Sequence, residues 1–333
     1  MTLTIYAATF LLTFLLIYLL MRNAGRLGML DIPNERSIHK EPMPRGAGIG
    51  FVSAVLIVTL LFNFSHFIEY YYIYLAIFLI FVVGTIDDKR GVSPLTKFVF
   101  IFFATLLLYL NDFHVVSLGC YLGYTVTLPA VLVLPFTFLA VAGFTNAFNL
   151  LDGLDGLAGA VSMVMLATFL AIGFLHHDTL IITLSSMFLV AVFGFLFFNW
   201  YPAKIFMGDS GSLTLGFVIS ILSIQSLEYM TPASVLFIIA LPILDTFMVM
   251  TRRIQRGISP FHADKNHMHH FLYNAKMDVR FTDILIIYIQ IAFSIIGYQL
   301  NQTDNLLNLI LFGILFYIFL NLLDQRIKHR HKE

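Results

Sequence analysis

The sequence predicts an all-α, polytopic integral membrane protein with about 11 transmembrane helices, an external N-terminus and a cytoplasmic C-terminus. Three observations lead to this fold class: the composition, the spacing of apolar runs and the distribution of basic residues. Of the 333 residues, 59% are apolar and 11% are charged, whereas soluble domains contain about 45–50% apolar and about 25% charged residues. This composition excludes a soluble enzyme, a disordered chain and a disulfide-stapled secreted module, and Cys120 is the only cysteine.

A membrane-spanning helix needs about 20 mostly apolar residues, and the chain offers eleven such runs, several of them short. They lie at 3–21, 47–64, 68–86, 97–110, 126–144, 157–174, 179–198, 212–227, 233–250, 283–300 and 305–323. No basic segment precedes the first run, so we expect a retained helix and not a cleaved signal peptide. We expect residues 1–333 to form a single transmembrane domain.

Basic residues decide the predicted orientation. All 19 Lys and Arg residues fall in one alternate set of connections: 22–46, 87–97, 145–156, 199–211, 251–282 and the tail 324–333. Lys and Arg accumulate on the cytoplasmic side of membrane proteins, so this set is assigned to the cytoplasm, and chemistry is expected there. The formal net charge of zero gives no reason to expect a nucleic-acid partner.

The first polar motif, GTIDDKRG at 84–91, ends an uncharged run with Asp87 and Asp88. A carboxylate at mid-bilayer costs roughly 2.5–3.5 kcal/mol, so two of them at the hydrocarbon edge need a reason. Neighbouring side chains on a helix point about 100° apart. We therefore expect one carboxylate to face a site and the other to hold a partner such as Lys97; an ordinary charged helix end is the alternative.

The second motif, NAFNLLDGLDGLAG at 146–159, places Asn149, Asp152 and Asp155 three residues apart. On a helix or tight turn this spacing puts them on one face. The connection contains no Lys or Arg, so its carboxylates require a cation or the hydroxyls and amides of a ligand. The alternative is a glycine-rich turn with solvated acids.

The third motif, NWYPAKIFMGDSGS at 199–212, opens the next run with small residues around Asp209. Free backbone N–H groups at a helix start favour an anion such as phosphate. Asp209 would repel that anion unless a divalent cation bridged them, and oxygen ligands with phosphates suit Mg²⁺ or Mn²⁺. The alternative is a helix start capped by Asp209 or Ser210.

The fourth motif, RRIQRGISPFHADKNHMHH at 252–270, combines three arginines with clustered histidines. Such a basic surface suits a pyrophosphate; zinc ranks lower because no cysteine lies nearby, and a solvated loop is the alternative. In the fifth motif, at 31–48, His39, Lys40 and Arg45 are candidates for contact with a nucleotide or lipid phosphate, or for membrane-surface anchoring.

Asp245 lies within the ninth apolar run. An acid inside a membrane segment is a functional candidate by default. Pairing with Arg252 or Arg253 is the structural alternative.

Together these motifs resemble the polyprenyl-phosphate N-acetylhexosamine-1-phosphate transferase family, glycosyltransferase family 4. The matching pieces are Asp87-Asp88, NLLDGLDG at 149–156, FMGDSGS at 206–212 and NHMHH at 266–270, in that order and on one predicted membrane side. The resemblance implies transfer of a sugar 1-phosphate from a UDP-sugar to undecaprenyl phosphate, with Mg²⁺, at the cytoplasmic face of the inner membrane. UMP would be released.

The pattern His267-Met268-His269-His270 resembles the branch that uses UDP-N-acetylglucosamine for O-antigen, common-antigen or teichoic-acid linkage synthesis. The peptidoglycan branch, which uses UDP-MurNAc-pentapeptide, usually shows three consecutive histidines, whereas Met268 interrupts them here. Other UDP-N-acetylhexosamines remain alternatives. Outside this class, a membrane transporter and a non-catalytic scaffold are the rivals.

The resemblance also implies roles for individual residues. Asp209 would bind Mg²⁺, with Mn²⁺ as a substitute and Asp152 as a second ligand, and Asp87 would face the acceptor phosphate. Catalytic tasks are assigned to Asp87, Asp88, Asp152, Asp155 and His267. Substrate binding is assigned to Asn149, Asn199, Lys97, Arg253, Arg256, His269, His270, His39 and Lys40. A homodimer is a family-level expectation.

Overall fold

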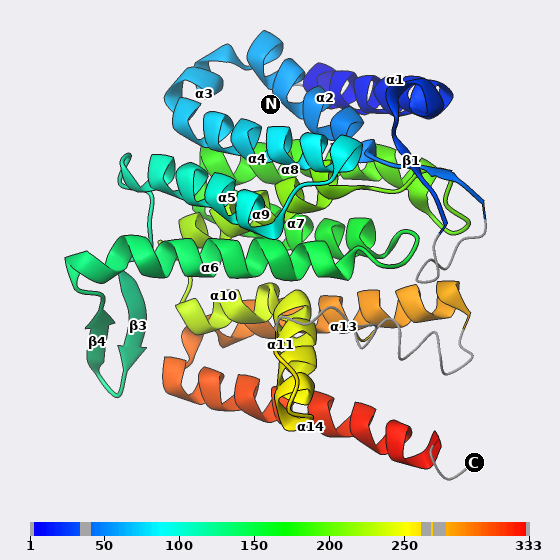
Figure 1. Ribbon diagram of the computed structural model, residues 1–333. Coiled ribbons are helices and arrows are strands. Elements are labelled where there is room, and N and C mark those ends of the chain that lie inside the picture. Colours follow the sequence, from blue (N-terminus) through cyan, green and yellow to red (C-terminus); the bar gives the residue numbers. More distant parts are fainter. Residues whose placement is uncertain (1–2, 34–40, 261–267, 269–277, 331–333) are drawn as a thin grey trace. The chain divides into compact units, whose positions relative to one another are not determined.

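The computed structural model of the chain describes residues 3–33, 41–260, 268 and 278–330, with backbone alone for 322–330. The described chain is mostly helical (Figure 1). The helices are α1 (Leu3–Leu27), α2 (Ala47–Phe62), α3 (Phe64–Glu69), α4 (Tyr71–Arg90), α5 (Pro94–Tyr109), α6 (Ala130–Leu151), α7 (Leu157–His176), α8 (Thr179–Asn199), α9 (Asp209–Ser226), α10 (Pro232–Ile238), α11 (Ala240–Gln255), α13 (Val279–Gln299), the 3₁₀ helix η1 (Leu300–Gln302) and α14 (Asn305–Arg330).

Each of the eleven predicted apolar runs overlaps a helix or, for 233–250, the bent pair α10–α11. Within the described residues, six helical segments are long and apolar enough to span a membrane: α1, α4, α6, α7, α8 and α13 with η1. The pair α10–α11, bent by 85°, would make a seventh, whereas α2, α5 and the part Asn305–Asn321 of α14 are shorter apolar helices. The structure agrees with a multi-pass helical membrane protein, while eleven crossings and their orientation stay predictions.

The helical fold also contains two short antiparallel hairpins that the sequence did not predict. In the first, β1 (Leu30–Asp31) pairs with β2 (Met43–Pro44), and in the second, β3 (Ser117–Tyr121) pairs with β4 (Tyr124–Thr127). Leu122 and Gly123 connect β3 to β4 with φ values of 51° and 83°. Two positive φ angles match the turn that joins adjacent antiparallel strands, but leucine rarely signals this conformation.

The chain divides into two compact units, which are described separately. Unit 1 contains residues 1–116 and 129–226, and unit 2 contains residues 117–128 and 227–333. The expectation of a single domain over 1–333 stays a prediction. In unit 1, α9 packs against α2, α4, α6, α7 and α8 (Figure 1). Between Ser210 and Ile224 its side chains are apolar or small on every side, as expected for a helix that is surrounded by others.

Glycines bring the start of α9 against its neighbours. A Cβ atom on Gly48 of α2 would lie 2.0 Å from the backbone nitrogen of Gly211, and one on Gly84 of α4 would lie 2.5 Å from the Asp209 carbonyl oxygen. Small residues permit such close approach of membrane helices. This packing places the third motif directly beside the end of the first.

In unit 2, the break between α10 and α11 frees backbone groups that must find other partners. The Gln290 side chain of α13 donates from Nε2 to the Ile238 carbonyl at 2.7 Å. The β3–β4 hairpin is held to α14, because Asn305 Nδ2 donates to the Cys120 carbonyl at 3.1 Å.

Candidate active site

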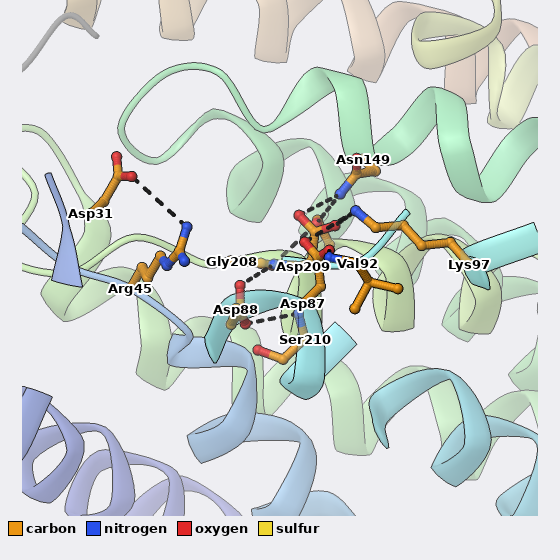
Figure 2. A network of polar contacts seen from close by, with 11 residues as sticks. Asp31, Arg45, Asp87, Asp88, Val92, Lys97, Asn149, Gly208, Asp209 and Ser210 are labelled. Atoms are coloured by element: carbon orange, nitrogen blue, oxygen red, sulfur yellow. Dashed lines mark hydrogen bonds and ion pairs between the residues drawn. The ribbon is translucent and has the colours of Figure 1, made fainter. Parts of the chain in front are cut away.

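In unit 1, the C-terminal ends of α4, α6 and α8 meet the N-terminal ends of α5 and α9. The first three motifs lie on these ends, and Figure 2 shows their side chains converging near the start of α9. In a chain that crosses a membrane repeatedly, every second connection between helices lies on the same side of the membrane. The sequence could therefore predict that these three motifs lie on one membrane side. Their contacts come from the packing around α9.

Lys97, in the first turn of α5, lies between two carboxylates. Its Nζ is 3.1 Å from Asp87 Oδ2 and also donates a hydrogen bond to Asp209 Oδ2 (Figure 2). This is the Lys97 partner that the sequence predicted for the aspartate pair, with Asp209 as an additional contact. The side chains are 17–23% exposed, so one ammonium faces two carboxylates in a partly desolvated place, where charge interactions are strengthened.

Asp88, the other member of the pair, is only 2% exposed. Its Oδ1 accepts the backbone N–H of Asp209 at 2.8 Å, and its Oδ2 accepts that of Ser210 at 3.0 Å. The carboxylate therefore caps α9 from a different helix and complements the positive end of the helix dipole. Gly208, at φ 73°, makes room, because a Cβ there would lie 2.5 Å from Asp88 Oδ1.

This cap corrects two expectations about the third motif. The side-chain cap of α9 is Asp88, not Asp209 or Ser210. The N–H groups that were expected to be free are also occupied, because the next two, of Gly211 and Ser212, donate to the Gly208 carbonyl. A phosphate contact at this helix start stays a prediction. The buried Asp88 carboxylate is the anion at this helix start.

Asn149, near the end of α6, holds Asp209 from the opposite side. Its Nδ2 donates to Asp209 Oδ1 at 3.2 Å and to Ser212 Oγ at 2.7 Å. Ser212 in turn donates to the Gly208 carbonyl at 3.1 Å. Asp209 is thus fixed between a cation and an amide. The sequence did not single out Ser212, although its position four residues after Gly208 is the spacing of a serine bonded back along a helix.

Asp152, directly after α6, differs from the other carboxylates. Over the described part of the chain, no group donates a hydrogen bond to its side chain. Burial, together with the negative charges of Asp209, Asp88 and Asp155, raises the pKa of Asp152 from 3.8 to about 8. Such a carboxylate requires a proton or a cation from outside the described residues.

Asp155 and Asn199 connect the second motif to the third. Asp155 Oδ2 accepts the Ala203 N–H at 2.9 Å. Asn199, 3% exposed, accepts the Gly156 N–H at 3.0 Å and donates to the Ile205 carbonyl at 2.8 Å. Asn149, Asp152 and Asp155 do not share a helix, because α6 ends at Leu151 and the chain turns at Gly156, with φ 80°. The tight turn was the other alternative, and a shared face for the three side chains stays a prediction.

A family profile described as glycosyl transferase family 4 matches residues 70–227, which contain all the site residues described above. The chain is 35% identical over 327 residues to a Bacillus subtilis (strain 168) protein named "Probable undecaprenyl-phosphate N-acetylglucosaminyl 1-phosphate transferase", covering 95% of this chain and 89% of the relative. The chain belongs to glycosyl transferase family 4.

Two further family 4 relatives are each named "Undecaprenyl-phosphate alpha-N-acetylglucosaminyl 1-phosphate transferase". The Salmonella typhi protein is 31% identical over 296 residues, covering 83% of this chain and 78% of the relative. The Yersinia pestis protein is 30% identical over 306 residues, covering 86% and 81%. The similarity thus extends beyond the profile match to most of each chain.

The family 4 resemblance implies Mg²⁺, and the described residues can be tested for it. No three His, Cys, Asp or Glu side chains among them form a preformed metal cage. Mg²⁺ usually needs only one or two carboxylates, completed by water and substrate phosphates. Asp152, whose side chain accepts no hydrogen bond from the described residues, fits that requirement. Asp209 could supply the second carboxylate if Mg²⁺ replaced the contact that its Oδ2 makes with Lys97.

Part of the fifth motif lies beside the third. Phe206 donates its N–H to the Pro44 carbonyl at 2.9 Å, and Gly48 donates to the Met207 carbonyl at 3.0 Å. Arg45 Nη1 lies 3.9 Å from Asp31 Oδ1 (Figure 2). The start of α2 thereby holds the loop that leads into Asp209.

The remaining predicted residues are distributed elsewhere. His39, Lys40, His267, His269 and His270 lie outside the described residues. Arg253 and Arg256 belong to unit 2, at the end of α11, where Arg253 Nη1 donates to the Pro260 carbonyl at 2.6 Å. Their predicted phosphate contacts stay predictions.

Proposed function

We propose that this family 4 protein transfers N-acetylglucosamine 1-phosphate from UDP-N-acetylglucosamine to undecaprenyl phosphate, releasing UMP. The names of the relatives support the acceptor and the transferred group. The observation that carries the chemistry is the position of the Lys97 ammonium between the carboxylates of Asp87 and Asp209. A cation held among carboxylates suits a reaction that brings several phosphate charges together.

In the proposed reaction, an acceptor phosphate oxygen bonds to the sugar-linked phosphorus of the donor, and the bond from that phosphorus to UMP breaks. The second ionisation of a phosphate monoester lies near pH 6, so the acceptor is mostly dianionic at neutral pH and a base would add little. We therefore assign Asp87 a positioning task through Lys97 and not proton abstraction. Lys97 would neutralise charge as the phosphates meet.

Mg²⁺ would be held by Asp209 and Asp152, with Mn²⁺ as a substitute, and would neutralise the donor pyrophosphate. Asn149 keeps Asp209 in its orientation. Asp88 would act as a positioning residue, because its carboxylate is saturated by the first two N–H groups of α9. Asp155 and Asn199 would shape the donor side by fixing the loops at 152–156 and 200–206.

We also propose that the site faces the cytoplasm from the inner membrane, with eleven crossings and an external N-terminus. The site is built on three connections, 87–97, 145–156 and 199–211, of the alternate set that together contains all 19 Lys and Arg residues. We further propose that the protein forms a homodimer, which is an expectation from the family resemblance.

The test is a transfer assay on washed membranes that contain the overproduced chain, with Mg²⁺, undecaprenyl phosphate and radiolabelled UDP-sugars. We expect butanol-extractable lipid label from UDP-N-acetylglucosamine, lost with EDTA and with Asp209→Asn. Asp112→Asn is the matched control, because Asp112 is exposed at φ 58°, a conformation that asparagine also adopts. Label from UDP-MurNAc-pentapeptide or another UDP-N-acetylhexosamine would change the donor. No label from any donor, with folded protein present, would favour the transporter.

A further inference from the structure

Arg45 is a cation of unit 1 that has no task in the reaction proposed above. Its side chain is 33% exposed, and its Nε is buried without a hydrogen-bond acceptor among the described residues. Its Nη1 lies 3.9 Å from Asp31 Oδ1, which is too far for a hydrogen bond. A guanidinium carries five N–H donors and is always charged in proteins. Arg45 therefore retains most of its capacity to bind an anion.

Main-chain hydrogen bonds fix the backbone of Arg45 from both sides. Before it, the Pro44 carbonyl accepts the Phe206 N–H at 2.9 Å, and after it, the Ala47 N–H donates to the Phe206 carbonyl at 3.1 Å. The N–H of Arg45 itself donates to the Met29 carbonyl at 3.1 Å. The side chain thus starts from a fixed point, as a preorganised binding group requires.

The residue after Arg45 lies against the carboxylate that caps α9. A Cβ atom on Gly46 would lie 3.3 Å from Asp88 Oδ2, and Asp88 accepts the N–H of Asp209 at 2.8 Å. In Figure 2, Arg45 lies on one side of Asp88 and Lys97 lies on the other. The cap of α9 is therefore flanked by two cations.

The charges of the site explain why a second protein cation is useful. The Lys97 ammonium is already shared by the carboxylates of Asp87 and Asp209. The proposed reaction adds the charges of an acceptor phosphate and of a donor pyrophosphate. Arginine can bind a phosphate through two parallel N–H···O bonds, whereas lysine acts as a point charge. Arg45 supplies this second kind of contact.

We infer that the Arg45 guanidinium binds a substrate phosphate group beside the Asp88 cap, which makes Arg45 a substrate-binding residue. This inference rests on the proposed function. The UDP-sugar and undecaprenyl phosphate present the same phosphate chemistry to a guanidinium, and the test distinguishes these two sources. In the structural alternative, Arg45 only pairs with Asp31 and steadies the β1–β2 hairpin. Ion pairs that are open to solvent contribute little to stability.

The kinetic test compares Arg45→Gln with Asp31→Asn in the full-length protein. Arg45→Gln should raise the KM for one substrate about tenfold to a hundredfold, as for loss of a hydrogen bond to a charged group. The other KM should stay within about twofold by the same reasoning. A raised KM for UDP-N-acetylglucosamine assigns Arg45 to the pyrophosphate, and a raised KM for undecaprenyl phosphate assigns it to the lipid phosphate.

Two further variants separate the charge of Arg45 from its ion pair. Arg45→Lys keeps the charge without the planar fork and should recover part of the lost KM. Asp31→Asn is the matched control, because it breaks the ion pair and leaves the guanidinium in place. It should leave both KM values unchanged. Equal losses in Arg45→Gln and Asp31→Asn would overturn the inference in favour of the structural alternative.

A second readout does not depend on activity: the melting temperature of the purified protein with and without inorganic pyrophosphate, at a fixed Mg²⁺ concentration. A ligand that binds only the folded state stabilises it. Pyrophosphate should therefore raise the melting temperature of the wild type and of Asp31→Asn, and this shift should shrink in Arg45→Gln.

The two readouts separate this inference from the proposed function. If the wild type has no transferase activity, the proposed function fails, while the pyrophosphate shifts still test the contact with Arg45. If Arg45→Gln does not fold, Arg45→Met, which keeps an aliphatic stem without the charge, carries both tests. Unchanged KM values for both substrates would overturn the inference. Equal pyrophosphate shifts in the wild type and in the uncharged variant would also overturn it.

Discussion

Asp88 and Asp152 belong to the same group of carboxylates, but their surroundings differ. Both oxygens of Asp88 accept backbone N–H groups at the start of α9, and the side chain is 2% exposed. Asp152 accepts no hydrogen bond from the described part of the chain, and its pKa is raised to about 8. The Asp88 carboxylate therefore stabilises the fold by capping α9, whereas the Asp152 carboxylate is available to bind a ligand. A cluster of aspartates is therefore not a set of equivalent catalytic groups.

The largest expected effect separates the two residues by activity. Asp152→Asn should lower the transfer rate by about 10²–10³-fold, as for removal of one charge-stabilising group in an active site. Its melting temperature at pH 7 without a cation should not fall, because the change replaces a mostly protonated carboxyl group with an uncharged amide of similar size. Initial rates and thermal unfolding in detergent measure the two effects. A variant with full activity would mean that Asp152 holds no ligand.

The second effect separates them by stability. Asp88→Ala leaves the N–H groups of Asp209 and Ser210 without their acceptor, and we expect a loss of about 2–4 kcal/mol. The melting temperature should fall, and the yield of folded protein with it. Asp87→Ala is the matched control on the adjacent residue, and it should affect activity more than stability. Equal melting temperatures for Asp88→Ala and Asp87→Ala would contradict the proposed capping role.

The third effect concerns pH. The raised pKa of Asp152 means that without a cation it is mostly protonated at pH 7, and that its ionisation destabilises the folded chain as pH rises from about 4 through about 8. Mg²⁺ must displace that proton. The Mg²⁺ concentration for half-maximal rate should therefore fall as pH rises from about 6 to about 8. Rates at several Mg²⁺ concentrations and pH values test this, and Asp152→Asn should flatten the dependence.

The smallest effect tests the support of Asp209. Ser212→Ala removes the hydroxyl that accepts from Asn149, and we expect about a threefold to tenfold loss of rate with little change in stability. Thr214→Ala is the control, because its hydroxyl donates only to the Ser210 carbonyl within the same helix. Equal losses in both variants would show that Ser212 has no special link to the site.

The sequence predicted the parts of the site better than their connections. The bounds of the apolar runs place Asp87, Lys97 and Asp209 at the ends of helices. The pairing of Lys97 with the aspartate pair was predicted because carboxylates at the edge of the hydrocarbon are costly without a partner. The cap formed by Asp88 could not be predicted, because it depends on the close approach of α4 and α9 at Gly84 and Gly208. The three-residue spacing of the second motif left a helix and a tight turn open, and the helix is excluded because α6 ends at Leu151.

The most direct test of the central claim follows the phosphate and the sugar together. UDP-N-acetylglucosamine would carry ³²P in the sugar-linked phosphate and ¹⁴C in the sugar, and the purified protein would be incubated with undecaprenyl phosphate and Mg²⁺. Both labels should enter the butanol-extracted lipid in equal molar amounts while UMP is released. Sugar label in the lipid without ³²P, with UDP as the product, would contradict the proposed transfer.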